Sequence, residues 1–287
     1  MLEAAKPKAL RTLRQFAEAE IVLPSGPREK LRFRTDYMPW TGLVLDEMEN
    51  PWWHRLFATG SVQSGKTLIF FSIPALFYLF EMEENVILGA PKLEMAQAIW
   101  QERLIPAIER TQFKELLPDS GRGSKGGQVA SIRFKHGPIL RFMGAGNSEK
   151  QISSHSARIV LATELDKMDT SGEVSRETDP VSLLEARNHA YGERGRMYGE
   201  CTVSERGGRI SVEVDVLGSG SRIFIRCPHC LDWLFPERIQ LIGWHEADNE
   251  IQVEQQARYV CQLCSKPWTE EDRRDALSHP RLVHKGQ

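Results

Sequence analysis

The pattern of apolar and polar positions along the chain predicts strands that alternate with helices. Residues 53–59 and 85–91 are short, mostly apolar runs of strand length, and the second run ends at glycine and proline. Residues 1–20 and 92–111 instead repeat apolar side chains at helical spacing. Strands separated by helical segments are typical of an α/β fold with a largely parallel sheet. Ligands of such sheets bind at the carboxyl ends of the strands.

Residues 68–80, LIFFSIPALFYLF, are apolar on every side. A helix of this kind is buried, either inside a protein or in a membrane. The run stops at Glu81, well short of the roughly 18 residues that a membrane span needs. We therefore predict a buried helix that is kinked or loosened at Pro74.

Two further apolar stretches complete the predicted sheet. Residues 130–145 predict two strands around a turn at His136 and Gly137. Residues 157–168 predict a short strand that runs into acidic residues. Residues 119–127, which are rich in glycine and serine, predict a mobile loop.

The segment GSVQSGKT, residues 60–67, lies between a predicted strand and the buried helix. It fits the pattern G-x-x-x-x-G-K-[ST], in which the backbone N–H groups of a glycine-rich loop surround a polyphosphate. The lysine of this pattern reaches the β- and γ-phosphates, and the final hydroxyl coordinates Mg²⁺. The predicted nucleotide-binding residues are Gly60, Ser61, Val62, Gln63, Ser64, Gly65, Lys66 and Thr67. The alternative is a glycine-rich turn ahead of a buried helix.

An ATPase with such a loop also needs acidic residues at the end of a nearby strand. Here the apolar residues 159–162 are followed by Thr163 and Glu164. Glu164 is predicted to polarise the attacking water, whereas Thr163 offers a neutral hydroxyl where a metal-binding aspartate is usual. Asp166 is close enough in sequence to reach the metal through water. The alternative is a core strand that ends in a solvated turn.

Four of the five cysteines form two C-x-x-C pairs separated by 30 residues: Cys227, Cys230, Cys261 and Cys264. Four thiolates can close a tetrahedral, structural Zn²⁺ site, and the residues between the pairs can form the hairpin strands of a zinc ribbon. The spacing is longer than usual, and Leu231 and Ser265 stand where glycine is frequent. A redox role for the C-x-x-C pairs is the alternative. Cys201 is predicted to be a buried, unpaired residue.

Composition narrows the class of protein. The chain has 287 residues, 41% of them hydrophobic and 26% charged, which is ordinary for a globular protein of one large or two smaller domains. The N-terminal segment has no apolar core, which excludes a secretory signal. The net charge of −2 disfavours a protein that coats nucleic acid. Any contact with DNA would therefore use a local patch or a ring of subunits.

Taken in order, these motifs resemble the ATPase part of the large terminase subunit of tailed bacteriophages, in the lambda-like branch. The resemblance runs from about Tyr37 to Cys264 and includes residues 60–67, 86–100, 144–148, 161–168, 179–191, 201–210 and 227–230. Residues 201–210, CTVSERGGRI, fall where that family carries a segment that couples hydrolysis to movement. The chain departs from the family's pattern at Thr163 and at Val203, where a proline is usual.

The resemblance implies an ASCE or RecA-like P-loop fold, with a mostly parallel sheet flanked by helices and a small C-terminal zinc ribbon. We accordingly divide the chain into a helical segment of the ATPase domain at residues 1–50, a P-loop core at residues 51–222 and a zinc ribbon at residues 223–287.

The resemblance also implies roles for single residues. Lys66 and Thr67 would bind ATP and Mg²⁺, and Glu164 would activate water. Thr202 would sense the γ-phosphate, and Tyr37 would pack on the adenine. An arginine finger is expected as well, and Arg158 is the candidate.

The implied activity is an ATP-driven motor that moves double-stranded DNA into a procapsid in the host cytoplasm. Its implied partners are the portal ring, a small terminase subunit and further copies of the chain in a ring, with no membrane. Because the chain stops at Gln287, we expect no nuclease domain and no DNA cleavage. One alternative is a helicase-like or repair ATPase, for which a second RecA-like domain would have no room. Another is a non-enzymatic zinc-ribbon module that binds DNA or protein and has a degenerate nucleotide site.

Overall fold

The computed structural model describes residues 9–23, 29–119, 130–144, 155–168 and 179–286. The chain divides into two compact units. The first unit comprises residues 1–33 and 45–218, and the second comprises residues 34–44 and 219–287. The segment 34–44 thus groups with the C-terminal part of the chain. The predicted loop at 119–127 and the turn at 144–148 lie almost entirely outside the described residues.

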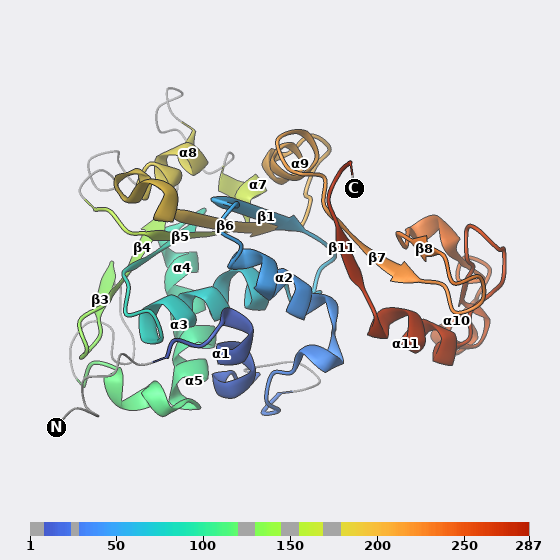
Figure 1. Ribbon diagram of the computed structural model, residues 1–287, viewed down its shortest axis with the longest axis horizontal. Coiled ribbons are helices and arrows are strands. Elements are labelled where there is room, and N and C mark those ends of the chain that lie inside the picture. Colours follow the sequence, from blue (N-terminus) through green and yellow to red (C-terminus); the bar gives the residue numbers. More distant parts are fainter. Residues whose placement is uncertain (1–8, 24–28, 120–129, 145–154, 169–178, 287) are drawn as a thin grey trace. The chain divides into compact units, whose positions relative to one another are not determined.

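A six-stranded sheet forms the centre of the first unit (Figure 1). Its strands, in spatial order, are β1 (Arg55–Thr59), β6 (Arg196–Cys201), β5 (Ile159–Thr163), β2 (Val86–Ala90), β4 (Ile139–Gly144) and β3 (Ser131–Arg133). All neighbouring pairs are parallel except β3 and β4 at the edge. The mostly parallel sheet expected from the sequence is confirmed.

The central strands are buried at every position because helices cover both faces of the sheet. Every residue of β2, β5 and β6 is buried, as the near-continuous apolar runs of parallel strands require. The helices α3 (Ile73–Phe80) and α4 (Leu93–Ile99) lie on one face, and α7 (Leu165–Met168) and α8 (Pro180–Glu185) lie on the other (Figure 1). Cys201, predicted to be buried and unpaired, lies in the core on the α7 side.

Two of the prolines inside the predicted helices, Pro74 and Pro106, lie just after a π-helical turn. Pro74 follows the turn η3 (Leu68–Ser72), and Pro106 follows η4 (Trp100–Leu104) at the start of α5 (Ile105–Glu109). In η3 the N–H of Ile73 donates to the carbonyl of Leu68, five residues earlier. Proline lacks an N–H and crowds the preceding turn, so the wider π turn accommodates it. The loosening predicted at Pro74 is therefore observed.

The first helix begins later than the apolar pattern predicts. It is α1 (Leu13–Glu20), and residues 1–8 of the predicted helix lie outside the described residues. A capping box sets its start, because the Thr12 hydroxyl accepts from the N–H of Gln15 at 3.2 Å and the Gln15 side chain accepts from the N–H of Thr12 at 3.0 Å.

The second unit contains a three-stranded antiparallel sheet in the order β11 (Arg281–Val283), β7 (Arg222–Arg226) and β8 (Trp233–Leu234). The strands β9 (Leu241–Ile242) and β10 (Arg258–Tyr259) form the hairpin predicted between the cysteine pairs. Two helices that the sequence analysis missed, α10 (Glu250–Gln256) and α11 (Glu270–Ser278), complete this unit. Ile225, Leu234 and Trp268 form its small core together with two of the cysteines.

The remaining helical segments are short. They are η2 (Thr35–Tyr37), α2 (Trp40–Met48), η5 (Gln112–Leu116), η6 (His189–Arg194), α9 (Arg209–Ser211), η7 (Val212–Val216) and η8 (Arg238–Gln240). Within the described part of the chain, no helix has both the length and the apolar character needed to cross a membrane.

Candidate nucleotide site and cysteine cluster

The strand order brings the predicted site residues to one edge of the sheet. The P-loop follows β1, Glu164 follows β5, and Thr202 follows β6, which lies between the other two strands. Because these strands are parallel, their carboxyl ends meet at the same edge. Three segments that are distant in sequence therefore converge there.

The P-loop has the backbone conformation that its glycines allow. Gly65 has a φ of 85°, and Gln63 also lies in the left-handed region, with a φ of 60°. Helical structure begins at Lys66, directly after the loop. Among the described residues, the buried Ser64 hydroxyl has no hydrogen-bond partner. An unsatisfied buried donor inside the loop fits a phosphate oxygen as its acceptor.

Lys66 connects the P-loop to the end of β6. Its side chain is buried, and the ammonium donates to the carbonyls of Gly60 at 3.0 Å and Ser61 at 2.7 Å and to the Thr202 hydroxyl at 3.0 Å. These three bonds use all the donors of an ammonium group. A triphosphate that binds Lys66 must therefore displace at least one of these acceptors, one of which is Thr202.

Glu200, at the end of β6, is a site residue that the sequence analysis missed. Only 2% of its surface is exposed, and its Oε1 accepts from the hydroxyl of Thr67 at 3.2 Å and from that of Thr163. Burial raises the pKa of Glu200 above its usual value, although hydrogen bonds from Thr163 and Thr67 and the charge of Lys66 oppose this shift. A glutamate at the end of the otherwise nonacidic strand segment RMYGEC was the signal in the sequence.

Glu164 lies at the carboxyl end of β5, as predicted. Its φ of 57° is in the left-handed region, which is uncommon for a residue with a side chain. The carboxylate is 32% exposed and forms an ion pair with Lys167 at 2.8 Å. The hydrogen bond to Glu164 raises the pKa of Lys167. The carboxylate is therefore accessible to water but is held by a neighbouring cation.

Asp166 holds the loop after β6. One carboxylate oxygen accepts from the N–H of Ser204 at 2.9 Å, and the other accepts from the N–H of Ile210 at 2.8 Å. A side chain at Gly208 would place its Cβ 2.8 Å from an Asp166 oxygen and would therefore displace the Asp166 carboxylate. The suggestion that Asp166 reaches the metal through water is not supported by these contacts.

Arg158 is not brought to the P-loop. It directly precedes β5 and therefore lies at the opposite edge of the sheet from Glu164. Its guanidinium pairs with Glu84 and donates to the carbonyl of Arg194 at 2.8 Å. Arg158 therefore does not lie at the P-loop of its own chain, and its role as an arginine finger stays a prediction. Tyr37 lies in η2 of the second unit and is 43% exposed, and its adenine contact stays a prediction.

The four cysteines of the two C-x-x-C pairs form one cluster in the second unit. Their sulfur atoms, from Cys227, Cys230, Cys261 and Cys264, all lie within 4.8 Å of one another. The two pairs have the same turn. The N–H of Leu231 donates to the backbone carbonyl of Cys227, and the N–H of Ser265 donates to that of Cys261, both at 2.9 Å.

Leu231 and Ser265 have φ values of 65° and 59°, which explains why glycine is frequent at these positions. Burial raises the pKa of Cys227, but hydrogen bonds from the backbone N–H groups of Cys230 and His229 lower it overall to about 6. Because the four sulfur atoms lie within 4.8 Å of one another, the donor set fits a metal ion held by four thiolates.

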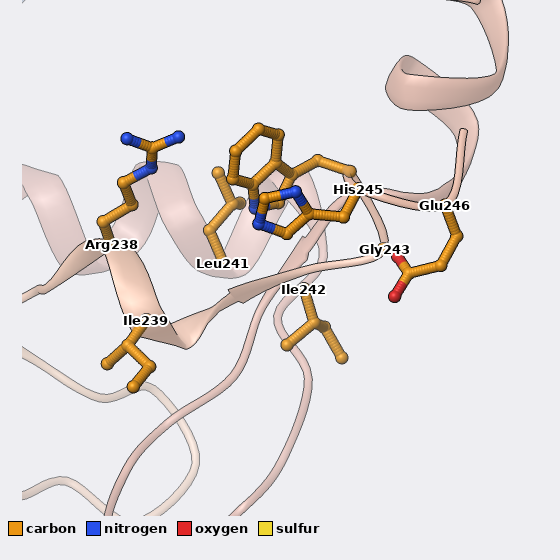
Figure 2. Close-up of a pocket in the computed structure, with 8 residues that line it drawn as sticks. Arg238, Ile239, Leu241, Ile242, Gly243, His245 and Glu246 are labelled. Carbon is orange, nitrogen blue, oxygen red and sulfur yellow. The ribbon is translucent and has the colours of Figure 1, made fainter. Parts of the chain in front are cut away.

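The second unit also has a pocket of about 450 Å³ formed by the segment 238–246 (Figure 2). The guanidinium carbon of Arg238 lies 4.6 Å from the centre of the Trp244 ring. The centre of the His245 ring lies 3.5 Å from that of Trp244, with the two rings tilted by 32°. Ile239 and Ile242 extend to the other side of the segment from Arg238 (Figure 2). No residue of the nucleotide site lines this pocket.

Comparisons with known proteins identify the family and support the fold. The family model described as phage terminase large subunit gpA, ATPase domain, matches residues 28–281. The large terminase of bacteriophage HK97 superposes with a TM-score of 0.54 at 13% identity, over 72% of this chain and 41% of that one. That similarity shows the fold, and this chain spans less than half the length of the HK97 protein.

Two other solved structures are more distant. The large terminase of a thermophilic bacteriophage has a TM-score of 0.38 and 16% identity, over 57% of this chain and 38% of that one. A mutant ATPase domain of the Thermus phage P74-26 large terminase has a TM-score of 0.32 and 17% identity, over 53% of this chain and 60% of that one. No curated protein matches the chain.

Proposed function

Because this chain belongs to the phage terminase large subunit gpA family through its ATPase domain, we propose that it hydrolyses ATP to move double-stranded DNA into a procapsid. The observation that carries this proposal is the convergence of Lys66, Thr67, Glu164 and Thr202 at one edge of the sheet. A helicase-like function and a non-enzymatic zinc-ribbon module are less well supported, because the family match spans the P-loop and both cysteine pairs.

In this mechanism the P-loop N–H groups and the Lys66 ammonium bind the phosphates. Glu164 orients a water for in-line attack on the γ-phosphate, as its partly exposed carboxylate at the strand end permits. The Thr67 hydroxyl would hold Mg²⁺, which would supply positive charge next to the phosphates. The fit of the loop to phosphate rests on the unsatisfied Ser64 hydroxyl inside it.

Thr202 is the proposed link between hydrolysis and movement. Its hydroxyl accepts from Lys66, so a phosphate that draws the ammonium away changes the end of β6. Asp166 joins the loop after Thr202 to α7, which begins directly after Glu164. A change at the phosphate can therefore be transmitted from Lys66 through Thr202 to the loop after β6, and through Asp166 to α7.

The cysteine cluster is proposed to hold a structural Zn²⁺, because a closed set of four thiolates suits that ion. The proposed partners are DNA, the portal ring and a small terminase subunit, with several copies of the chain in a ring in the host cytoplasm. The portal and the small subunit follow from the family alone.

The experiment that tests the function is ATP hydrolysis with Mg²⁺, measured with and without duplex DNA. Lys66→Ala is expected to abolish nucleotide binding. Glu164→Gln is expected to bind ATP with unchanged affinity but to lower turnover by about 100-fold or more, because it removes only the group that acts on water. Lys114→Ala, which removes an exposed lysine, is the matched control.

Wild-type turnover in the Glu164→Gln variant would refute the assigned chemistry. Absence of nucleotide binding in the wild-type chain would refute the ATPase function itself. DNA-stimulated turnover that rises further with purified portal and procapsid would distinguish packaging from a helicase-like activity.

A further inference from the structure

We propose that Glu200 supplies the carboxylate ligand for the metal ion of the bound nucleotide, in place of the aspartate that Thr163 replaces. The inference rests on the proposed ATPase function and deepens it. The sequence pattern places the metal-binding carboxylate at the end of β5, whereas this inference assigns it to the neighbouring strand β6.

The strand pairing places Glu200 directly beside Thr163, the position where the metal-binding aspartate is expected. Thr163 and Glu200 are direct partners in the parallel pair of β5 and β6. Paired residues on neighbouring strands lie on the same face of a sheet, about 5 Å apart. The Glu200 side chain leans toward β5, because its carboxylate accepts a hydrogen bond from Thr163. The side chains of both residues meet at this point, since the Thr163 hydroxyl donates to Glu200.

The contact with Thr67 has the spacing of two ligands on one small cation. The Thr67 hydroxyl, the P-loop group that coordinates Mg²⁺, lies 3.2 Å from Oε1 of Glu200. Mg²⁺ binds six ligands at 2.0–2.1 Å in an octahedron, so adjacent ligands lie about 3 Å apart. Thr67 and Glu200 therefore need little movement to become neighbouring ligands.

The burial of Glu200 also favours a cationic ligand. A carboxylate that is 2% exposed is costly to ionise unless a charged partner compensates. Within the described part of the chain, no ion pair involves Glu200, and the Lys66 ammonium donates to carbonyls and to Thr202 instead. The two threonine hydroxyls can rotate, so they can turn their lone pairs toward a metal and leave the carboxylate available.

The competing interpretation is that Glu200 only ties the P-loop to β5 through hydrogen bonds. Glu200→Gln separates the two roles, because glutamine keeps the length of the side chain and one acceptor oxygen but loses the negative charge. The probe is fluorescent mant-ADP, with its affinity measured in EDTA and in Mg²⁺. Mn²⁺ binding to the ADP complex, followed by electron paramagnetic resonance, is the second readout.

The wild-type chain is expected to bind mant-ADP more tightly in Mg²⁺ than in EDTA. Glu200→Gln is expected to keep its affinity for mant-ADP in EDTA within twofold, but to lose most of the increase in affinity that Mg²⁺ gives the wild-type chain. Its ADP complex is expected to bind Mn²⁺ at least tenfold more weakly. Thr163→Asp, introduced into Glu200→Gln, is expected to restore the increase in mant-ADP affinity with Mg²⁺, because it places a carboxylate on β5 next to position 200. Glu205→Gln, the same change at an exposed position, is the control.

The inference is overturned if Glu200→Gln retains the full Mg²⁺ gain and Mn²⁺ affinity, an outcome that leaves the proposed ATPase function intact. If Glu200→Gln does not fold, the double variant decides, and a folded double variant without the Mg²⁺ gain overturns the inference. A wild-type chain that binds no nucleotide in either condition overturns the proposed function, and this inference with it.

Discussion

Replacement of Asp166 by asparagine distinguishes a residue that holds a loop from one that serves the metal. Asp166 is 4% exposed, and its two oxygens accept one backbone N–H each, from Ser204 and Ile210. Asparagine has the same shape, but it keeps a single acceptor oxygen and turns an NH₂ group toward the other N–H. The substitution therefore removes one charge-assisted hydrogen bond, weakens the second and leaves a buried donor unsatisfied.

A hydrogen bond to a charged group contributes about 1.5–3 kcal/mol, and an unsatisfied buried donor costs about 1–3 kcal/mol. The two costs describe the same lost hydrogen bond, so they are not added together. We therefore expect Asp166→Asn to lower the unfolding free energy of the first unit by about 2–3 kcal/mol. Urea unfolding followed by circular dichroism measures this loss.

The same variant is expected to leave the Mg²⁺ concentration for half-maximal ATP hydrolysis unchanged within twofold. Asp119→Asn, which removes an exposed ion pair with Lys135, is the control and should cost less than about 1 kcal/mol. A loss in Asp166→Asn no larger than that of the control would refute the loop-holding role. A several-fold rise in the Mg²⁺ requirement without loss of stability would show that Asp166 serves the metal.

Three further predictions follow from other contacts. Lys167→Met should raise ATP turnover without DNA by up to about fivefold, because it frees Glu164 from an exposed ion pair worth at most about 1 kcal/mol; lower turnover would contradict this. Gly199→Ala should cost about 1–3 kcal/mol in urea unfolding, since its Cβ would lie 2.4 Å from the Phe57 ring, and unchanged stability would contradict the packing. Removal of metal by a chelator should unfold the second unit and make its four clustered thiols reactive to a thiol reagent, whereas an unchanged melting curve would argue against a structural metal.

The local part of the site was predictable because its signals lie within single short segments. The P-loop is contiguous, and the apolar runs around it are long enough to give β1 and the buried helix. The position of Arg158 was also within reach of the sequence. A five-residue strand spans about 16 Å, so a residue before β5 and a residue after it lie at opposite edges of the sheet.

The sequence marks Glu200 as the acidic residue of β6, but its partner on β5 could not be predicted. Its contact with Thr163 depends on the pairing of two strands that are distant in sequence, and no local pattern encodes that register. The helices α10 and α11 were missed because they are short and polar. Their ends are instead stabilised by the side chains of Asn249 and Thr269, which accept from backbone N–H groups in the first turn.

Side chains alternate between the two faces of a strand, so the positions of Glu200, Cys201 and Thr202 at the end of β6 depend on one another. Glu200 and Thr202 are two residues apart and contact the P-loop, while Cys201 between them is fully buried in the core. Insertion or deletion of one residue in β6 would exchange these positions, placing a cysteine at the phosphates and a carboxylate in the apolar core. Related P-loop proteins that have no aspartate at the position of Thr163 should therefore be sought by the spacing Glu-x-Thr at the end of the strand that pairs with β5.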